Sequence, residues 1–245
     1  MFQPGLVSVS FREKSPSEII KAANAAGLGC IEWGSDVHAP CNDTQRLIQI
    51  KDECHRNGIH CCSYGTYFRI GQTPTDEIYA YIRAAKLLGT NILRIWAGNK
   101  NSGEYTDSEK QAFFAECATL ASIAEQENVV LCLECHSGTF TDCLSGWTEL
   151  FSKVDSHCFK TYWQPNQFKS FAENLAYAGA VAHKTAVIHA FHWRNTDKFP
   201  LIEGKCEWQA YLKPFQDIPV LLEFMPDNRI ESLTFEADAL REIIG

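Results

Sequence analysis

The fold class that the sequence predicts is α/β, a single-domain (β/α)₈ TIM barrel spanning residues 1–245. Eight apolar runs recur with starts separated by about 24 to 37 residues, the spacing of a repeated strand–helix unit. They are rich in β-branched and aromatic residues and alternate little with polar ones, as is typical of parallel strands buried on both faces. The predicted strands are Leu6–Phe11, Cys30–Trp33, His60–Tyr64, Ile92–Ala97, Val129–Glu134, Phe159–Gln164, Thr185–Phe191 and Pro219–Phe224.

Helix start and stop signals separate these runs. Ser15-Pro16 opens a helix that Gly27 closes, and Thr75 opens another that ends at Gly89. Asp107 begins a helix that ends near Asn128, and residues 230–244 form the last one. A doubly wound open sheet is the structural rival. It would be expected to carry a Gly-rich phosphate-binding turn after its first strand, and this sequence has none there.

Composition argues against two kinds of partner, nucleic acid and membrane. The formal net charge of −8, with scattered Lys and Arg, argues against nucleic acid as the main partner. No apolar stretch approaches the roughly 18 residues of a membrane span, and no signal peptide is recognisable, so a cytoplasmic location without membrane contact is expected. The 11 cysteines, several of them inside apolar runs, are interpreted as structural thiols.

Four consecutive predicted strands carry a polar residue at the same height, at or near their ends: Glu134, Gln164, His189 and Glu223. In a TIM barrel these ends form the active-site face. A carboxylate that follows four or five apolar residues is costly to bury unless it is paired or binds a metal. We therefore expect these four side chains to hold one divalent ion, Mn²⁺ by preference, with Mg²⁺, Co²⁺ or Zn²⁺ as alternatives. In the simpler interpretation no metal is bound, and each of these polar groups forms its own hydrogen bonds with the loop backbone.

Further polar and aromatic residues near strand ends are candidates for substrate binding. Three arginines there would suit an anionic sugar, such as a sugar acid or phosphate, although loop-surface positions explain each arginine equally well. His192 is also the rival of His189 for the ligand role. Arg94, inside a strand, is expected to pair with a barrel carboxylate such as Glu32. The substrate-binding candidates are Arg12, His38, Arg69, His136, His192, Arg194 and Trp163.

With these motifs the chain resembles the xylose-isomerase-like TIM barrels, a superfamily of sugar isomerases and epimerases, inosose dehydratases and the apurinic endonuclease. The likeness covers the whole chain in architecture. Its specific signals are Leu133-Glu134, Trp163-Gln164-Pro165, His189 followed by His192-Trp193, and Leu222-Glu223-Phe224. The ketose 3-epimerases of this family bind one metal through Glu, Asp, His and Glu. Gln164 stands where they carry Asp, which removes one negative charge from the ligand set and is expected to weaken metal binding.

The resemblance implies an isomerase or epimerase of a small sugar or sugar derivative. Glu134 and Glu223 would each serve as ligand and as proton acceptor or donor beside a metal-polarised carbonyl. Proton abstraction there can equally lead to elimination, so a lyase or dehydratase acting on a keto-sugar is the first alternative. A non-catalytic sugar-binding barrel is the second. The endonuclease branch is disfavoured by short loops and the acidic balance. Barrels of this family often dimerise, so the resemblance also implies a homodimer.

Overall fold

The computed structural model describes residues 1–245, and its eight parallel strands close into a barrel in the order β1-β10-β7-β6-β5-β4-β3-β2. The fold-class prediction, a (β/α)₈ TIM barrel, is therefore confirmed. Closure comes from β1, which pairs with both β10 and β2. The barrel strands are β1 (Gln3–Val7), β2 (Cys30–Gly34), β3 (His60–Arg69), β4 (Ile92–Trp96), β5 (Val130–Glu134), β6 (Phe159–Trp163), β7 (Thr185–Ala190) and β10 (Pro219–Leu222).

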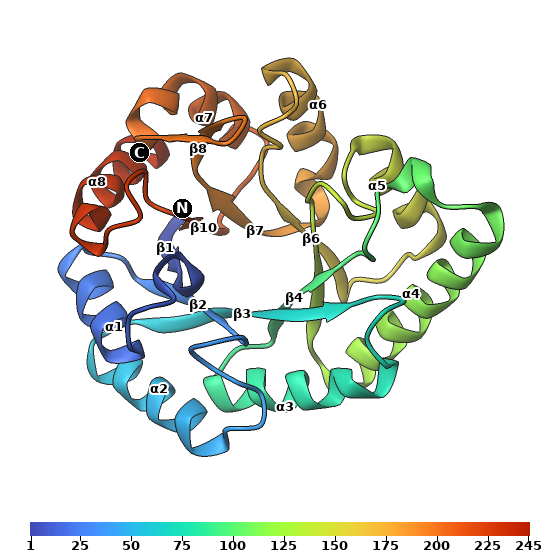
Figure 1. Ribbon diagram of the computed structural model, residues 1–245, viewed down its shortest axis with the longest axis horizontal. Coiled ribbons are helices and arrows are strands. Elements are labelled where there is room, and N and C mark those ends of the chain that lie inside the picture. The colour runs from blue at the N-terminus through green and yellow to red at the C-terminus, as the bar shows by residue number, and fades with distance from the viewer.

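Eight helices surround the strands as an outer ring (Figure 1). No helix combines the length and the apolar character needed to cross a membrane. The helices are α1 (Pro16–Ala25), α2 (Thr44–Arg56), α3 (Ile78–Leu88), α4 (Asp107–Glu127), α5 (Leu144–Lys153), α6 (Phe171–Val181), α7 (Lys205–Leu212) and α8 (Leu233–Ile244).

The helix boundaries follow the local signals. Ser15 and Glu18 form a reciprocal capping box at the start of α1, where Pro16 is the first helical residue. Gly89 ends α3 and Asn128 ends α4, both in the left-handed conformation with φ of 89° and 55°. The last helix begins at Leu233, after a 3₁₀ turn over Ile230–Ser232.

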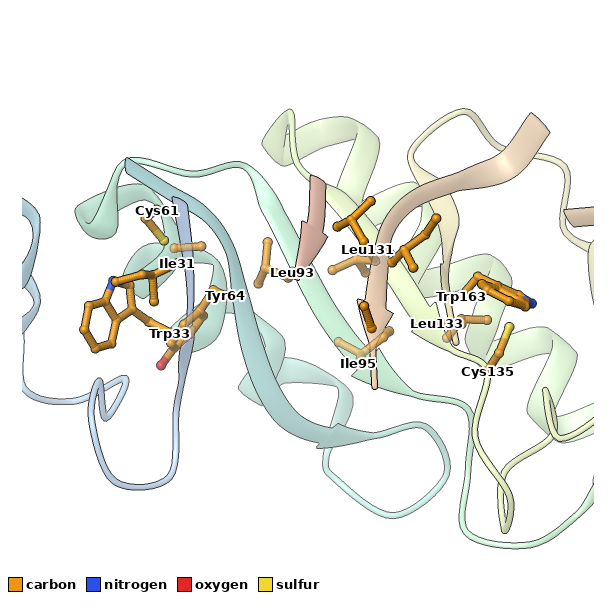
Figure 2. Packing of buried hydrophobic residues seen from close by; sticks show 14 of the residues in the cluster. Ile31, Trp33, Cys61, Tyr64, Leu93, Ile95, Leu131, Leu133, Cys135 and Trp163 are labelled. Carbon is orange, nitrogen blue, oxygen red and sulfur yellow. The ribbon is translucent and has the colours of Figure 1, made fainter. Parts of the chain in front are cut away.

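Two apolar layers arise because successive strand residues point to opposite faces. Outward-facing residues such as Leu131, Leu133 and Trp163 pack in the large core between strands and helices (Figure 2). The inward-facing layer is small. Apart from the ring of Tyr162, its side chains are aliphatic groups and thiols. It consists of Val7, Val9, Cys30, Cys62, Cys132, Tyr162, Val187 and Leu221. All 11 cysteines are free thiols.

The first predicted strand, Leu6–Phe11, ends earlier than expected. β1 stops at Val7, and Ser8–Phe11 forms a 3₁₀ turn. The turn is stabilised by hydroxyl groups, because the Ser8 Oγ accepts the Gly34 N–H at 2.9 Å and the Ser10 Oγ accepts the Phe224 N–H at 2.9 Å. After β7, an unpredicted hairpin of β8 (His192–Arg194) and β9 (Asp197–Phe199) projects from the barrel end.

Candidate functional site

The structure brings together the four residues that the sequence predicts as metal ligands. Glu134 ends β5, His189 lies in β7, and Gln164 and Glu223 directly follow β6 and β10. The ligand atoms of Glu134, His189 and Glu223 lie within 4.8 Å of one another. Around the His189 Nδ1, the nearest oxygens are Gln164 Oε1 at 3.2 Å, Glu223 Oε2 at 3.5 Å and Glu134 Oε1 at 3.7 Å.

A second set of buried charges lies deeper in the barrel. Arg94 of β4 donates a hydrogen bond to Glu134, and its Nε is 3.3 Å from the Oε1 of Glu32 on β2. The Nε2 of His189 is 3.4 Å from the other Glu32 oxygen. The predicted Arg94–Glu32 pair is thus confirmed. The Arg94–Glu134 contact was not predicted, although an arginine inside an apolar strand was the available signal.

These charges shift one another's pKa values. Burial raises the pKa of Glu134, but the positive charges of Arg94 and His189 outweigh burial and hold it below its usual range. Burial also raises the pKa of Glu223, and His189 offsets this only in part because the Glu134 charge adds to it. Burial lowers the pKa of His189, yet Glu223 and Glu32 outweigh that and raise it to about 10.

The donor set fits a divalent cation. Glu32 and Arg94 cancel in charge, which leaves two carboxylates, the buried Glu134 and the mostly buried Glu223, beside an imidazole and an amide oxygen. Two carboxylates this close repel each other, and protons on His189 and Glu223 are one way to relieve that repulsion. A dication balances both charges, and Mn²⁺, Mg²⁺, Co²⁺ and Zn²⁺ all accept oxygen and imidazole donors.

A cavity of about 250 Å³ opens above this cluster, and Glu134, Gln164 and Glu223 form part of its lining. Arg12, Arg69 and His136 also line it, as the sequence predicts for substrate-binding residues. The His136 Nδ1 lies 2.6 Å from the Ser137 carbonyl oxygen, so this nitrogen donates and Nε2 is left without a protein partner.

The two cavity arginines differ in how their charges are neutralised. The Arg12 Nε donates to Asp36 at 2.8 Å, and its Nη2 donates to the Tyr67 hydroxyl at 2.6 Å. Arg69 forms no ion pair. Its Nη1 donates to the Gly98 carbonyl at 3.0 Å, and its guanidinium lies 4.2 Å from the centre of the Trp96 ring. Arg69 therefore presents an uncompensated positive charge in a fixed position.

Two other predicted substrate contacts lie away from this cavity. His38 is fully buried, with its ring nitrogens 3.2 Å from the Ser8 Oγ and 3.1 Å from the Lys14 carbonyl oxygen. Trp163 precedes Gln164 and therefore faces the opposite side of β6, where its ring packs against Tyr211 and Phe215 of the helical layer. Both residues stabilise the fold at these positions, and their assignment to the cavity is corrected.

The β8–β9 hairpin diverts His192 and Arg194 into a neighbouring cavity of about 210 Å³. Arg194 lies over the Phe199 ring at 5.0 Å, and the His192 ring packs against Gly204. His192 is therefore not an alternative to His189 in the cluster. Gln167, Phe191 and Trp193 line both cavities. Of these three, the sequence singles out only Trp193, as part of the His192-Trp193 segment that follows His189.

Fold and site together define a class: a parallel (β/α)₈ barrel with a Glu/His/Glu cluster at the carboxyl ends of its strands. The chain belongs to the xylose isomerase-like TIM barrel family, whose model matches residues 20–242. The resemblance inferred from the sequence is therefore confirmed.

Individual relatives include both lyases and epimerases. A 3-dehydroshikimate dehydratase of Bacillus anthracis is 33% identical over 166 residues, which cover 61% of this chain and 57% of that protein's length. The crystal structure of a probable 3-DHS dehydratase from Bacillus anthracis superposes with a TM-score of 0.82 at 20% identity, covering 98% of this chain and 99% of the other. The D-psicose 3-epimerase of Clostridium cellulolyticum has a TM-score of 0.71 at 13% identity, with 99% and 98% covered.

Proposed function

We propose that this protein is a divalent-metal-dependent lyase that removes water from a small, anionic, sugar-related keto compound. The observation that carries the proposal is the buried Glu134/His189/Glu223 cluster, with two carboxylates that no protein cation fully neutralises. When bound by these residues and Gln164, a divalent ion such as Mn²⁺ would polarise a substrate carbonyl and acidify the adjacent C–H bond.

The two glutamates are suited to different tasks. Arg94 binds Glu134, so this carboxylate is held in place as a ligand. Glu223 receives no arginine hydrogen bond, and its side chain, 12% exposed, borders the cavity. We assign Glu223 as the base that accepts the proton from the carbon next to the carbonyl. His136 lines the same cavity and would protonate the departing hydroxyl, so that the sum of the steps is loss of one water.

The cavity favours an anionic substrate because Arg69 carries an uncompensated charge there. The dehydratase relative takes its name from 3-dehydroshikimate, a cyclic keto acid, and this gives the substrate class that we propose for this chain. A carboxylate at Arg69 would hold one end of the ring while the carbonyl faces the metal ligands.

The test is to incubate the purified protein with 3-dehydroshikimate and Mn²⁺ and to follow the product by mass spectrometry. We expect a product lighter by one water, no reaction after chelation, and loss of activity in Glu223→Gln. Glu134→Ala and Glu223→Ala should each lose bound metal by elemental analysis. A metal-loaded protein that leaves this and related keto acids intact would contradict the lyase proposal.

An isomerase or epimerase is the second candidate, because Glu134 and Glu223 flank the same Nδ1 of His189 and two carboxylates are what a two-base proton transfer needs. Its signature is deuterium uptake from D₂O into a panel of ketoses without loss of water. A metal-loaded protein that shows neither water loss nor exchange would instead be a sugar-binding barrel.

A further inference from the structure

Glu32 belongs neither to the candidate ligand set nor to the cavity lining, yet it lies directly behind both. It is fully buried within β2. A buried carboxylate is costly unless it is paired, and Glu32 is paired three times. Its oxygens lie 3.4 Å from the His189 Nε2, 3.3 Å from the Arg94 Nε and 3.2 Å from the Ser63 hydroxyl, which donates to it.

The contact with His189 determines which ring nitrogen is available to a metal. An ionised carboxylate only accepts hydrogen bonds, so the Nε2 that faces Glu32 must carry a proton. In the neutral imidazole the lone pair then lies on Nδ1. That nitrogen faces Gln164, Glu223 and Glu134, at 3.2 to 3.7 Å.

Glu32 also acts on a second ligand. It pairs with Arg94, and Arg94 in turn donates to Glu134. One carboxylate on β2 thus contacts the ligand on β7 directly and the ligand on β5 through a single side chain. Partners of this kind orient metal ligands and fix the tautomer of a ligating histidine.

We propose that Glu32 is a positioning residue that fixes His189 with Nδ1 toward the metal and anchors Arg94 behind Glu134. The inference rests on the metal site of the proposed function.

Gly65 on β3 makes room for this arrangement. A Cβ at Gly65 would lie 2.5 Å from the Glu32 Oε1 and 3.0 Å from the Arg94 Nη2. Gly65→Ala therefore displaces the Glu32–Arg94 pair without removing either charge. This gives a second perturbation, independent of any change at Glu32 itself.

The experiment measures Zn²⁺ affinity by competition with a chromophoric chelator, and the His189 tautomer by ¹⁵N NMR of the histidine-labelled, Zn²⁺-loaded protein. In the wild type we expect Nδ1 bound to Zn²⁺ and Nε2 protonated. Glu32→Gln keeps the side-chain shape but places an amide between His189 and Arg94. It should weaken Zn²⁺ binding by about 10- to 100-fold and disturb the histidine resonances.

Ser63→Ala is the matched control, because it removes one hydrogen bond to Glu32 and leaves the contact with His189 in place. Its Zn²⁺ affinity should stay within a few-fold of the wild type. If Glu32→Gln fails to fold, as judged by circular dichroism, Gly65→Ala carries the test and should weaken binding in the same direction.

The outcomes separate this inference from the proposed function. Tight Zn²⁺ binding with an unchanged His189 tautomer in both Glu32→Gln and Gly65→Ala would overturn the role of Glu32 and leave the metal site standing. A wild type that binds Zn²⁺ through Nε2 would overturn it as well. A wild type that binds no divalent ion would overturn the metal site and this inference together.

Discussion

Gln164 is the one member of the candidate ligand set whose side chain cannot ionise. Its Oε1 lies 3.2 Å from the His189 Nδ1, so a carboxylate at this position would face the same point as Glu134 and Glu223. Gln164→Glu keeps the side-chain length and adds a negative charge. We expect the Zn²⁺ dissociation constant to fall at least about tenfold, since each added charge near a buried dication is attractive.

The control for this substitution is Gln167→Glu, which adds the same charge to the same cavity outside the cluster. Its effect on Zn²⁺ affinity should be clearly smaller. Equal gains from both variants would mean that Gln164 acts through general electrostatics and not as a ligand.

The two cavity arginines allow a matched comparison at the substrate end. Arg69→Gln removes an uncompensated charge, so kcat/KM for an anionic substrate should fall about 10- to 100-fold. This is the loss expected when one hydrogen bond between charged groups is removed. Arg12→Gln removes a charge that Asp36 already neutralises, and the loss should be smaller. Zn²⁺ affinity should be unchanged in both. A larger loss from Arg12→Gln would contradict the assignment of Arg69 to the substrate anion.

At the scale of elements, Glu236 joins α8 to the 3₁₀ turn Leu201–Gly204 that precedes α7. Its carboxylate accepts the Leu201 N–H at 2.9 Å. Burial raises the pKa of Glu236; the Leu201 N–H opposes this shift, and the charge of Asp227 adds to it. A raised pKa in the folded state means that ionisation of Glu236 destabilises the fold as the pH rises through that pKa.

Glu236→Gln retains a carbonyl acceptor for Leu201 and cannot ionise. We therefore expect a higher free energy of unfolding than in the wild type at pH 7, with the difference vanishing near pH 4, where glutamate is largely protonated in the unfolded chain as well. Urea titrations at both pH values measure this. A variant less stable than the wild type at pH 7 would show that the ionised carboxylate stabilises the contact.

Elements whose ends carry a local chemical signal were predictable. Ser15, Gly89 and Asn128 mark helix ends because capping depends on one or two neighbouring residues. The β8–β9 hairpin was not predictable, since strands of three residues are too short to show a periodicity.

Within the site, too, some features were predictable from the sequence and others were not. Glu134 and His189 converge as expected because the ends of parallel strands lie at one edge of the barrel. Trp163 was misplaced because adjacent strand residues face opposite sides, so it cannot share a cavity with Gln164. The Arg94–Glu134 contact depends on the stagger between neighbouring strands, which the sequence alone does not reveal.

At the scale of the whole molecule, the close packing of β1 between β10 and β2 requires a glycine at position 5. A Cβ at Gly5 would lie 2.6 Å from the Leu221 Cδ2 of β10 and 2.7 Å from the Cys30 carbonyl oxygen of β2. Gly5→Ala should lower the free energy of unfolding by about 1–3 kcal/mol, as overpacking of a tight core does. Denaturant titration checks this.

Gly179 provides the opposite case, because it lies in α6 with nothing within 4 Å of an added Cβ. Gly179→Ala should raise stability by about 0.5–1 kcal/mol, since alanine favours the helix. The same denaturant titration measures this gain. For Gly5→Ala, a stability equal to that of the wild type would contradict the prediction above and show that β1 can shift to accept the methyl group.

The chain divides its site unevenly between its two halves. Glu32 and Arg94 come from β2 and β4, whereas all four candidate ligands follow α4. A polypeptide cut in the connection between β4 and α4 would leave every candidate ligand on one fragment and both Glu32 and Arg94, which hold those ligands in place, on the other. Neither fragment would be expected to hold an ion tightly alone, and ion capture would report the reassembly of the two pieces.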